Sequence, residues 1–184
     1  MGRRFALVLA VAALLGLAAA PSAGATSLGR LLAPTAACAN QNDLDAPVVL
    51  QERAMRCMTD FARRHARLAG LDHAVVLDWS AEDKSGDILR CDSFSHYACG
   101  RGFTYWMERV GYIPTRCWRA GENIAWGTGN LGTVRSIFNA WLHSPEHLAN
   151  ILGPYRQLGV GLRVGRLGGY GGAHVWTQHF GTHC

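Results

Sequence analysis

The chain has 184 residues with a formal net charge of +5, and 49% of the residues are hydrophobic. This is long enough for one domain with a buried core. The basic residues are almost all arginines, with Lys84 the single lysine, and they are dispersed rather than clustered. A dispersed charge of this size argues against a nucleic-acid-binding surface.

The N-terminus has the three parts of a secretory signal peptide. Two arginines in Met1–Arg4 precede an apolar run of 16 residues, Phe5–Ala20, and the small residues Ala23–Ala25 follow as an A-x-A-like cleavage site. An uncleaved membrane anchor is the alternative, but a spanning helix needs about 20 apolar residues. We therefore predict a signal peptide over residues 1–25, a secreted, extracellular protein, and no transmembrane anchor.

The cysteine count predicts disulfides. All six cysteines follow the predicted cleavage site, and an even number in an exported chain favours three bridges. A zinc site is the alternative, but no C-x-x-C pair supports it. The cysteines are Cys38, Cys57, Cys91, Cys99, Cys117 and Cys184.

Spacing alone does not select a connectivity for six cysteines. Cys91 and Cys99 are close enough for a local bridge, and a bridge from Cys38 to Cys184 would tie the two ends of the domain together. Cys57 is then left to pair with Cys117.

The first half of the chain predicts a short leader followed by helices. Residues 26–46 show no sustained period and form an N-terminal leader segment ahead of the domain, residues 47–184. Apolar residues at helical spacing predict a helix over residues 48–68, which Gly70 ends. A second helix is predicted from Ser80 to about Leu89, with Ser80 and Asp83 as an N-terminal capping box.

The second half predicts three more helices. One covers Phe103–Val110 and is closed by Gly111. Another covers Thr133–His143, where apolar residues recur at i, i+3, i+4 and i+7. A short helix then begins at Ser144, with Ser144 as N-cap and Pro145 at the first helical position.

The C-terminal region changes to the period of strands. Residues 158–164 and 173–180 alternate like two strands, and the glycine-rich residues 165–172 join them as a flexible hairpin loop. Helices followed by antiparallel strands predict an α+β fold in layers.

Three polar residues stand in surroundings that favour a site. His96 lies between Cys91 and Cys99, so that a disulfide would fix its loop, and Glu122 lies between glycines and aromatic residues. His147 is near the start of the short helix, where the helix dipole disfavours a charged imidazole. Two neutral imidazoles and a carboxylate would suit a divalent metal or proton transfer. Alternatively, Glu122 pins a turn and His147 satisfies a carbonyl.

A zinc-protease motif, H-x-x-E-H, also occurs at His143–His147. That chemistry needs both histidines on one helical face, and Pro145 separates them into two helices. We therefore place His143 outside the site. His179, beside Gln178, is expected to line an edge of the sheet, and the remaining histidines show no spacing that indicates a site.

Five motifs in order resemble one family, the CAP superfamily of cysteine-rich secretory, antigen 5 and pathogenesis-related 1 proteins, and in particular its bacterial exported branch. The resemblance covers roughly residues 48 to 181 and each motif contributes to it. The motifs are Phe94–His96, Gly121–Ala125, Trp141–Ile151, Leu158–Gly161 and Trp176–Gly181.

The resemblance implies a three-layer α-β-α sandwich, an SCP-type domain with a small antiparallel sheet flanked by helices. It also implies a cleft with two His and two Glu that in some members binds a divalent cation such as zinc. Carried over, His96, Glu122 and His147 are three of the four residues, and Ser144 stands where the second Glu is expected. A metal site made of these three residues would therefore bind weakly.

The family has no single established reaction, and members have been linked to lipid or sterol binding, to defence and to protein interactions. The resemblance favours a monomeric extracellular module that binds a lipid, a cell-envelope component or a protein, rather than an enzyme. The alternative is a secreted hydrolase that uses His96, Glu122 and His147.

Overall fold

The structure is a computed structural model that describes residues 28–183, so the predicted signal peptide lies outside the described residues. A four-stranded sheet forms its centre, in the order β1-β3-β4-β2. The strands are β1 (Asp72–His73), β2 (Trp118–Gly127), β3 (Gln157–Leu167) and β4 (Tyr170–His183). β2, β4 and β3 pair antiparallel, whereas the two-residue β1 pairs parallel with β3.

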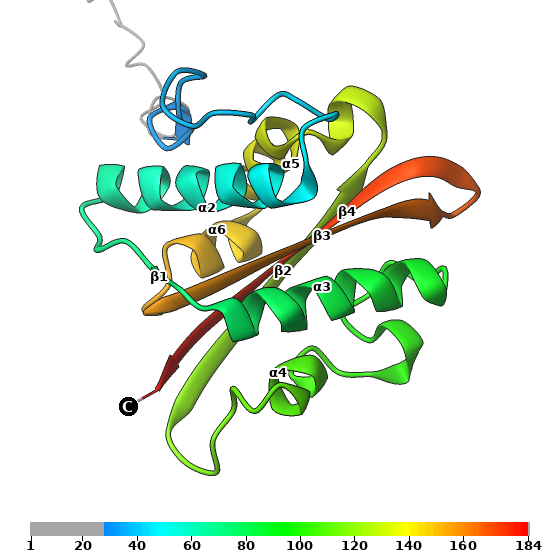
Figure 1. Cartoon of the computed structure of the whole chain (residues 1–184). Coiled ribbons are helices and arrows are strands. Elements are labelled where there is room, and N and C mark those ends of the chain that lie inside the picture. The colour runs from blue at the N-terminus through cyan, green and yellow to red at the C-terminus, as the bar shows by residue number, and fades with distance from the viewer. Residues whose placement is uncertain (1–27, 184) are drawn as a thin grey trace, which may run out of the picture.

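Helices cover both faces of this sheet (Figure 1). On one face lie α2, α5 and α6, and on the other lie α3 and α4. This confirms the predicted α+β fold and the α-β-α sandwich. The helices are α2 (Val48–His65), α3 (Val75–Arg90), α4 (Tyr105–Arg109), α5 (Val134–Leu142) and α6 (Pro145–Ile151), with 3₁₀ turns at Ala98–Gly100 and Gly129–Gly132.

The main core lies between the sheet and the layer of α2, α5 and α6. Side chains from one face of α2 and of α5 meet side chains of β3 and β4 there. Burying side chains of this size is the main favourable contribution to folding. The largest of them are Met55, Phe138, Trp141, Trp176 and Phe180.

On the other face, α3 lies directly against the backbone of β3. A Cβ on Gly159 would stand 2.1 Å from the carbonyl carbon of Leu77, and one on Gly161 would stand 2.1 Å from the backbone nitrogen of Glu82. Only glycine allows this approach. The two glycines therefore set the position of α3, which carries part of the site described below.

Most helices agree with the sequence predictions, but the start of α3 does not. It begins at Val75 instead of Ser80, because Asp72 and His73 pair with β3 and the chain turns at Ala74 into the helix. Ser80 is therefore inside the helix, and its hydroxyl donates to the carbonyl of Leu77 rather than capping an N-terminus.

The strands differ from the predictions in three respects. Neither the two-residue β1 nor β2 was predicted, and in β2 the glycines and the buried polar residues Glu122 and Asn123 hide the alternation of a strand. The predicted hairpin loop is shorter, since β3 runs to Leu167 and β4 begins at Tyr170. His179 is fully buried on the central strand β4 instead of at a sheet edge.

Two disulfides are described in full, and no described cysteine is free. Cys91 pairs with Cys99, as predicted. Cys38 pairs with Cys57, so the predicted pairs Cys38–Cys184 and Cys57–Cys117 are wrong. Cys117 is also disulfide-bonded, and Cys184 lies outside the described residues.

The Cys38–Cys57 bridge follows from the path of the leader. Residues 28–46 fold back over α2 and α5, and Leu31, Ala33 and Cys38 are buried in the main core. Arg135 of α5 donates to the carbonyl of Ala33 at 2.6 Å. The leader is thus packed against the domain, which brings Cys38 beside α2.

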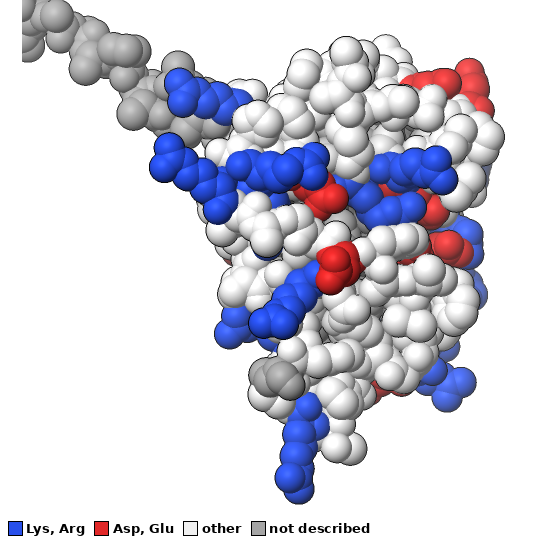
Figure 2. All heavy atoms as spheres, turned by 60° about the vertical axis from the view of Figure 1, so that its left-hand side comes forward, with Lys and Arg blue, Asp and Glu red and all other residues white. Residues whose placement is uncertain are grey.

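Charged side chains are mixed on the face that carries the C-terminal end of α2 and β1. Figure 2 shows basic side chains spread over this face with acidic side chains between them, and since the single lysine is buried, the basic ones are arginines. In residues 28–183, no helix is long and apolar enough to span a membrane.

Candidate functional site

The loop that carries His96 is held by its own disulfide. His96 lies between the end of α3 and the 3₁₀ turn at Ala98–Gly100, and the Cys91–Cys99 bridge closes this segment. The imidazole of His96 is half exposed, with 49% of its side-chain surface accessible. Its Nδ1 faces inward and lies 2.5 Å from Oε1 of Glu122.

Glu122 is the centre of a polar group that we call the Glu122 cluster: His96, Glu122, His179 and Lys84. His96 is half exposed, and the other three are buried. Oε2 of Glu122 lies 2.8 Å from Nε2 of His179, its cross-strand neighbour on β4. Nζ of Lys84, from α3, lies 3.8 Å from Oε1. Both carboxylate oxygens therefore have protein partners.

These partners keep Glu122 ionised. Burial by itself raises the pKa of this carboxyl, but the hydrogen bonds from His179 and His96 and the charges of His179 and Lys84 outweigh it. The net pKa of Glu122 lies below its ordinary value. The pKa of Lys84 is lowered, because its burial outweighs the attraction of Glu122.

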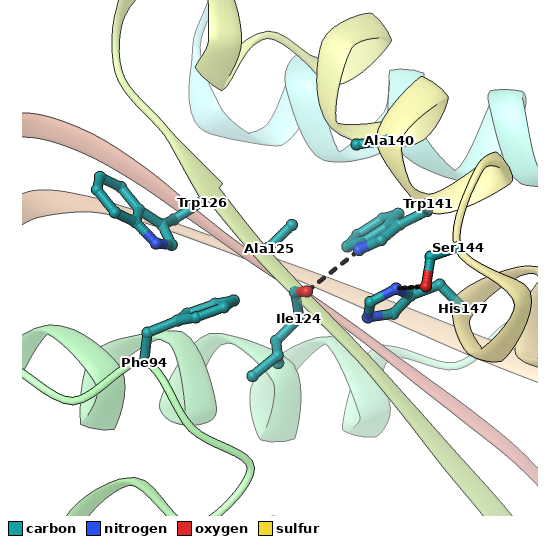
Figure 3. Close-up of a pocket in the computed structure, with 8 residues that line it drawn as sticks. All are labelled: Phe94, Ile124, Ala125, Trp126, Ala140, Trp141, Ser144 and His147. Carbon is teal, nitrogen blue, oxygen red and sulfur yellow. Dashed lines mark hydrogen bonds between the residues drawn. The ribbon is translucent and has the colours of Figure 1, made fainter.

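An open cavity of about 280 Å³ lies along β2, the strand at one edge of the sheet (Figure 3). We call it the aromatic cavity, since its walls include one phenylalanine and two tryptophans. Its lining is otherwise small or aliphatic, apart from one polar end. The lining residues are Phe94, Ile124, Ala125, Trp126, Ala140, Trp141, Ser144 and His147.

His147 and Ser144 form the polar end of the cavity (Figure 3). Oγ of Ser144 lies 2.8 Å from Nδ1 of His147. Ser144 is the N-cap of α6 with Pro145 at the first position, as predicted, but its hydroxyl makes no capping bond to the helix backbone. Burial is the main reason that the pKa of His147 is lowered; a charge on His96 lowers it further, and the charge of Glu146 raises it. This imidazole is therefore neutral at physiological pH.

The backbone of β2 connects the cavity to the Glu122 cluster. The side-chain amide of Asn150, on α6, donates to the carbonyl of Glu122 at 3.1 Å. The amide of Asn123 donates to the carbonyl of His147 at 3.2 Å. These bonds hold α6 against β2, the strand that carries Glu122. The positions of the cavity and of the Glu122 cluster therefore both depend on β2.

Of the three predicted site residues, His96 and Glu122 are in direct contact, and His147 lies on the helix bonded to the same strand. His143 is exposed at the end of α5, and its Nδ1 lies 2.8 Å from the carbonyl of Asn139. It is thus on a different helix from His147, as Pro145 indicated.

Sequence reasoning missed Lys84 and His179. The signal for Lys84 was present, since it is the single lysine in a chain whose other basic residues are arginines. His179 lies in the family motif Trp176–Gly181, but nothing in that motif indicated a contact with Glu122. Its place beside Glu122 follows from the register of β2 and β4.

The residues as they stand do not fit a metal ion. His96, His179 and Lys84 already occupy both oxygens of Glu122. Within the part of the chain that the structure describes, no group of three or more His, Cys, Asp or Glu side chains is arranged to hold a metal. This arrangement therefore gives no support to the weak metal site that the resemblance implied.

The sequence model of the cysteine-rich secretory protein family, CAP, matches residues 57–180, which is more than half of the chain. The chain belongs to the CAP family. The match includes His96, Glu122 and His147. A comparison with curated proteins found no match.

Three solved structures share the CAP fold of this chain. An extracellular SCP-domain protein from Bacillus anthracis has 23% identity and a TM-score of 0.59, over 71% of this chain and 39% of that one. An outer surface protein from Borrelia burgdorferi has 16% identity and a TM-score of 0.58, over 71% and 90%. A cysteine-rich secretory protein from Staphylococcus aureus has 15% identity and a TM-score of 0.55, over 74% and 40%. At these identities the likeness concerns the fold.

Proposed function

We propose that this CAP-domain protein is exported and binds a small, largely apolar ligand that carries one polar group. The aromatic cavity is the observation that carries the proposal. Phe94, Trp126 and Trp141 offer apolar walls, while His147 and Ser144 offer hydrogen bonds at one end only. Ligand sites are typically apolar clefts with a few placed polar groups.

The cavity suits a neutral ligand. Its lining has no Lys, Arg, Asp or Glu, and His147 is neutral because burial lowers its pKa. A volume of about 280 Å³ corresponds to a small molecule or to one segment of a longer lipid. Export is supported by the signal-peptide pattern and by the disulfides.

The test is a titration of the mature protein with 1-octanol, followed by tryptophan fluorescence and calorimetry. Phe94→Ala should weaken binding roughly tenfold, because it removes one apolar wall. Tyr97→Ala is the matched control, since Tyr97 is in the same loop, is 72% exposed and is not part of the cavity. Equal affinity in wild type and Phe94→Ala would contradict the proposal.

A secreted hydrolase is the second candidate, and the contact between His96 and Glu122 favours it. A carboxylate that orients an imidazole through Nδ1 is a common arrangement for a general base. If the protein hydrolyses a p-nitrophenyl ester, His96→Ala and His147→Ala should abolish turnover. Octanol binding without ester turnover would contradict the hydrolase and support the ligand-binding function.

A further inference from the structure

Lys84 is buried, and a buried ammonium group requires polar partners in the protein. Only 1% of its side-chain surface is accessible, and burying an unpaired ammonium is costly. Nζ donates to the carbonyl of His96 at 2.5 Å and lies 3.8 Å from Oε1 of Glu122. The single lysine of the chain thus holds both the His96 loop and the carboxylate that His96 contacts.

His179 holds the other side of the same carboxylate. Its Nε2 lies 2.8 Å from Oε2 of Glu122, and its Nδ1 lies 2.7 Å from the hydroxyl of Ser80 on α3. His179 is fully buried, so this chain of contacts is closed to solvent at its inner end. Only His96 extends from the cluster to the surface.

The partners of Glu122 determine the tautomer of His96. An ionised carboxylate only accepts hydrogen bonds, so the Nδ1 that faces it must carry the proton. When the His96 imidazole is neutral, its Nε2 is then a hydrogen-bond acceptor on the side away from Glu122. Phe94, two residues earlier in the same loop, is part of the wall of the aromatic cavity.

We propose that Lys84 and His179 are positioning residues that hold Glu122 in protein contacts instead of leaving it to a metal ion, and that fix His96 with Nε2 as an acceptor on the side away from Glu122. The site is then metal-independent, and the cation next to its carboxylate is the ammonium of Lys84. The ligand is a molecule with a hydroxyl or amide N–H that donates to His96. This last step rests on the proposed function, whereas the roles of Lys84 and His179 do not.

The decisive measurement is the His96 tautomer, read from ¹⁵N shifts of the full mature protein. Wild type should show the Nδ1–H form. Lys84→Met and His179→Gln should each shift His96 toward a mixture, because Glu122 loses a partner that orients it. His174→Gln is the matched control, since His174 is also on β4 and its Nδ1 lies near the carbonyl of Gly172.

Zinc calorimetry near neutral pH gives an independent readout. Wild type should show no saturable zinc binding, and Lys84→Met should show saturable binding because the competing cation is gone. Wild-type zinc binding that Glu122→Gln abolishes, or a wild-type His96 in the Nε2–H form, would overturn the proposal. If a variant fails to fold, the two wild-type measurements still decide. If wild type does not bind octanol but gives the expected tautomer and zinc results, the proposed function is contradicted and the roles of Lys84 and His179 are not.

Discussion

The sheet has two edges, and a buried glutamate lies at each of them. Beyond the short β1, the outward N–H groups of Val160 and Leu162 on β3 donate to the carboxylates of Asp78 and Glu52, at 2.8 and 3.0 Å. At the other edge, Glu122 extends from β2 to the cluster beside the cavity. One edge is therefore closed by carboxylates, while the other carries the candidate site.

Glu52 and Glu122 have the same exposure, 6%, yet their pKa values move in opposite directions. Burial raises the pKa of Glu52 to about 7 against the hydrogen bond from Leu162, and the charges of Glu82 and Asp78 add to the rise. Glu122 has two imidazoles and an ammonium as partners, and its pKa falls. The comparison shows that the partners, and not burial alone, set the charge of a buried carboxyl.

The largest expected effect comes from removing the charge of Glu122. Glu122→Gln leaves Lys84 and His179 buried without their anion, so the free energy of unfolding should fall by about 3 kcal/mol. Urea unfolding at neutral pH measures this. Glu146→Gln, at an exposed position, is the control and should change little. Equal losses in both variants would show that the cluster does not depend on its carboxylate.

A smaller effect, dependent on pH, is expected at the closed edge. Because the pKa of Glu52 in the folded state, about 7, exceeds the ordinary value of 4.5, its protonated form is favoured by folding. Its contribution to stability is present at low pH and is lost as the pH rises from about 4.5 through 7. Glu52→Gln keeps an acceptor for Leu162 but cannot ionise, so it should remove this loss.

We expect Glu52→Gln to be more stable than wild type by roughly 1–2 kcal/mol near pH 8 and similar to wild type near pH 4. Unfolding at both pH values measures the difference. Glu146→Gln again serves as control, because Glu146 is exposed and is not among the charges that act on the pKa of Glu52. A constant difference at the two pH values would show that Glu52 does not titrate in this window.

The smallest effect on stability is expected at the β2 edge, which carries the candidate site. The hydroxyl of Ser144 contacts His147 and not the helix backbone, so Ser144→Ala should change stability by less than about 0.5 kcal/mol. Thr133 does cap α5, where it accepts from the backbone N–H of Ser136. Thr133→Ala should therefore cost about 1 kcal/mol. Thermal unfolding of the two variants compares them, and a reversed order would mean that Ser144 supports α6.

Much of the helical layer and one contact of the site, between His96 and Glu122, were accessible from sequence. α2, α4, α5 and α6 follow from local periodicity and from Gly or Pro at their ends, which short-range sterics determine. The pairing of Cys91 with Cys99 follows from their short separation. The family motifs indicated His96, Glu122 and His147 as neighbours.

Tertiary structure alone decided the start of α3, the strand β2, the partner of Cys38, and the places of Lys84 and His179. Each depends on contacts between segments distant in sequence, as when β4 brings His179 beside Glu122. The sequence determined by itself where helices form and which residue types are available, because those depend on neighbours along the chain. Which polar side chains become partners depended on strand register and on how closely α3 approaches the glycines of β3.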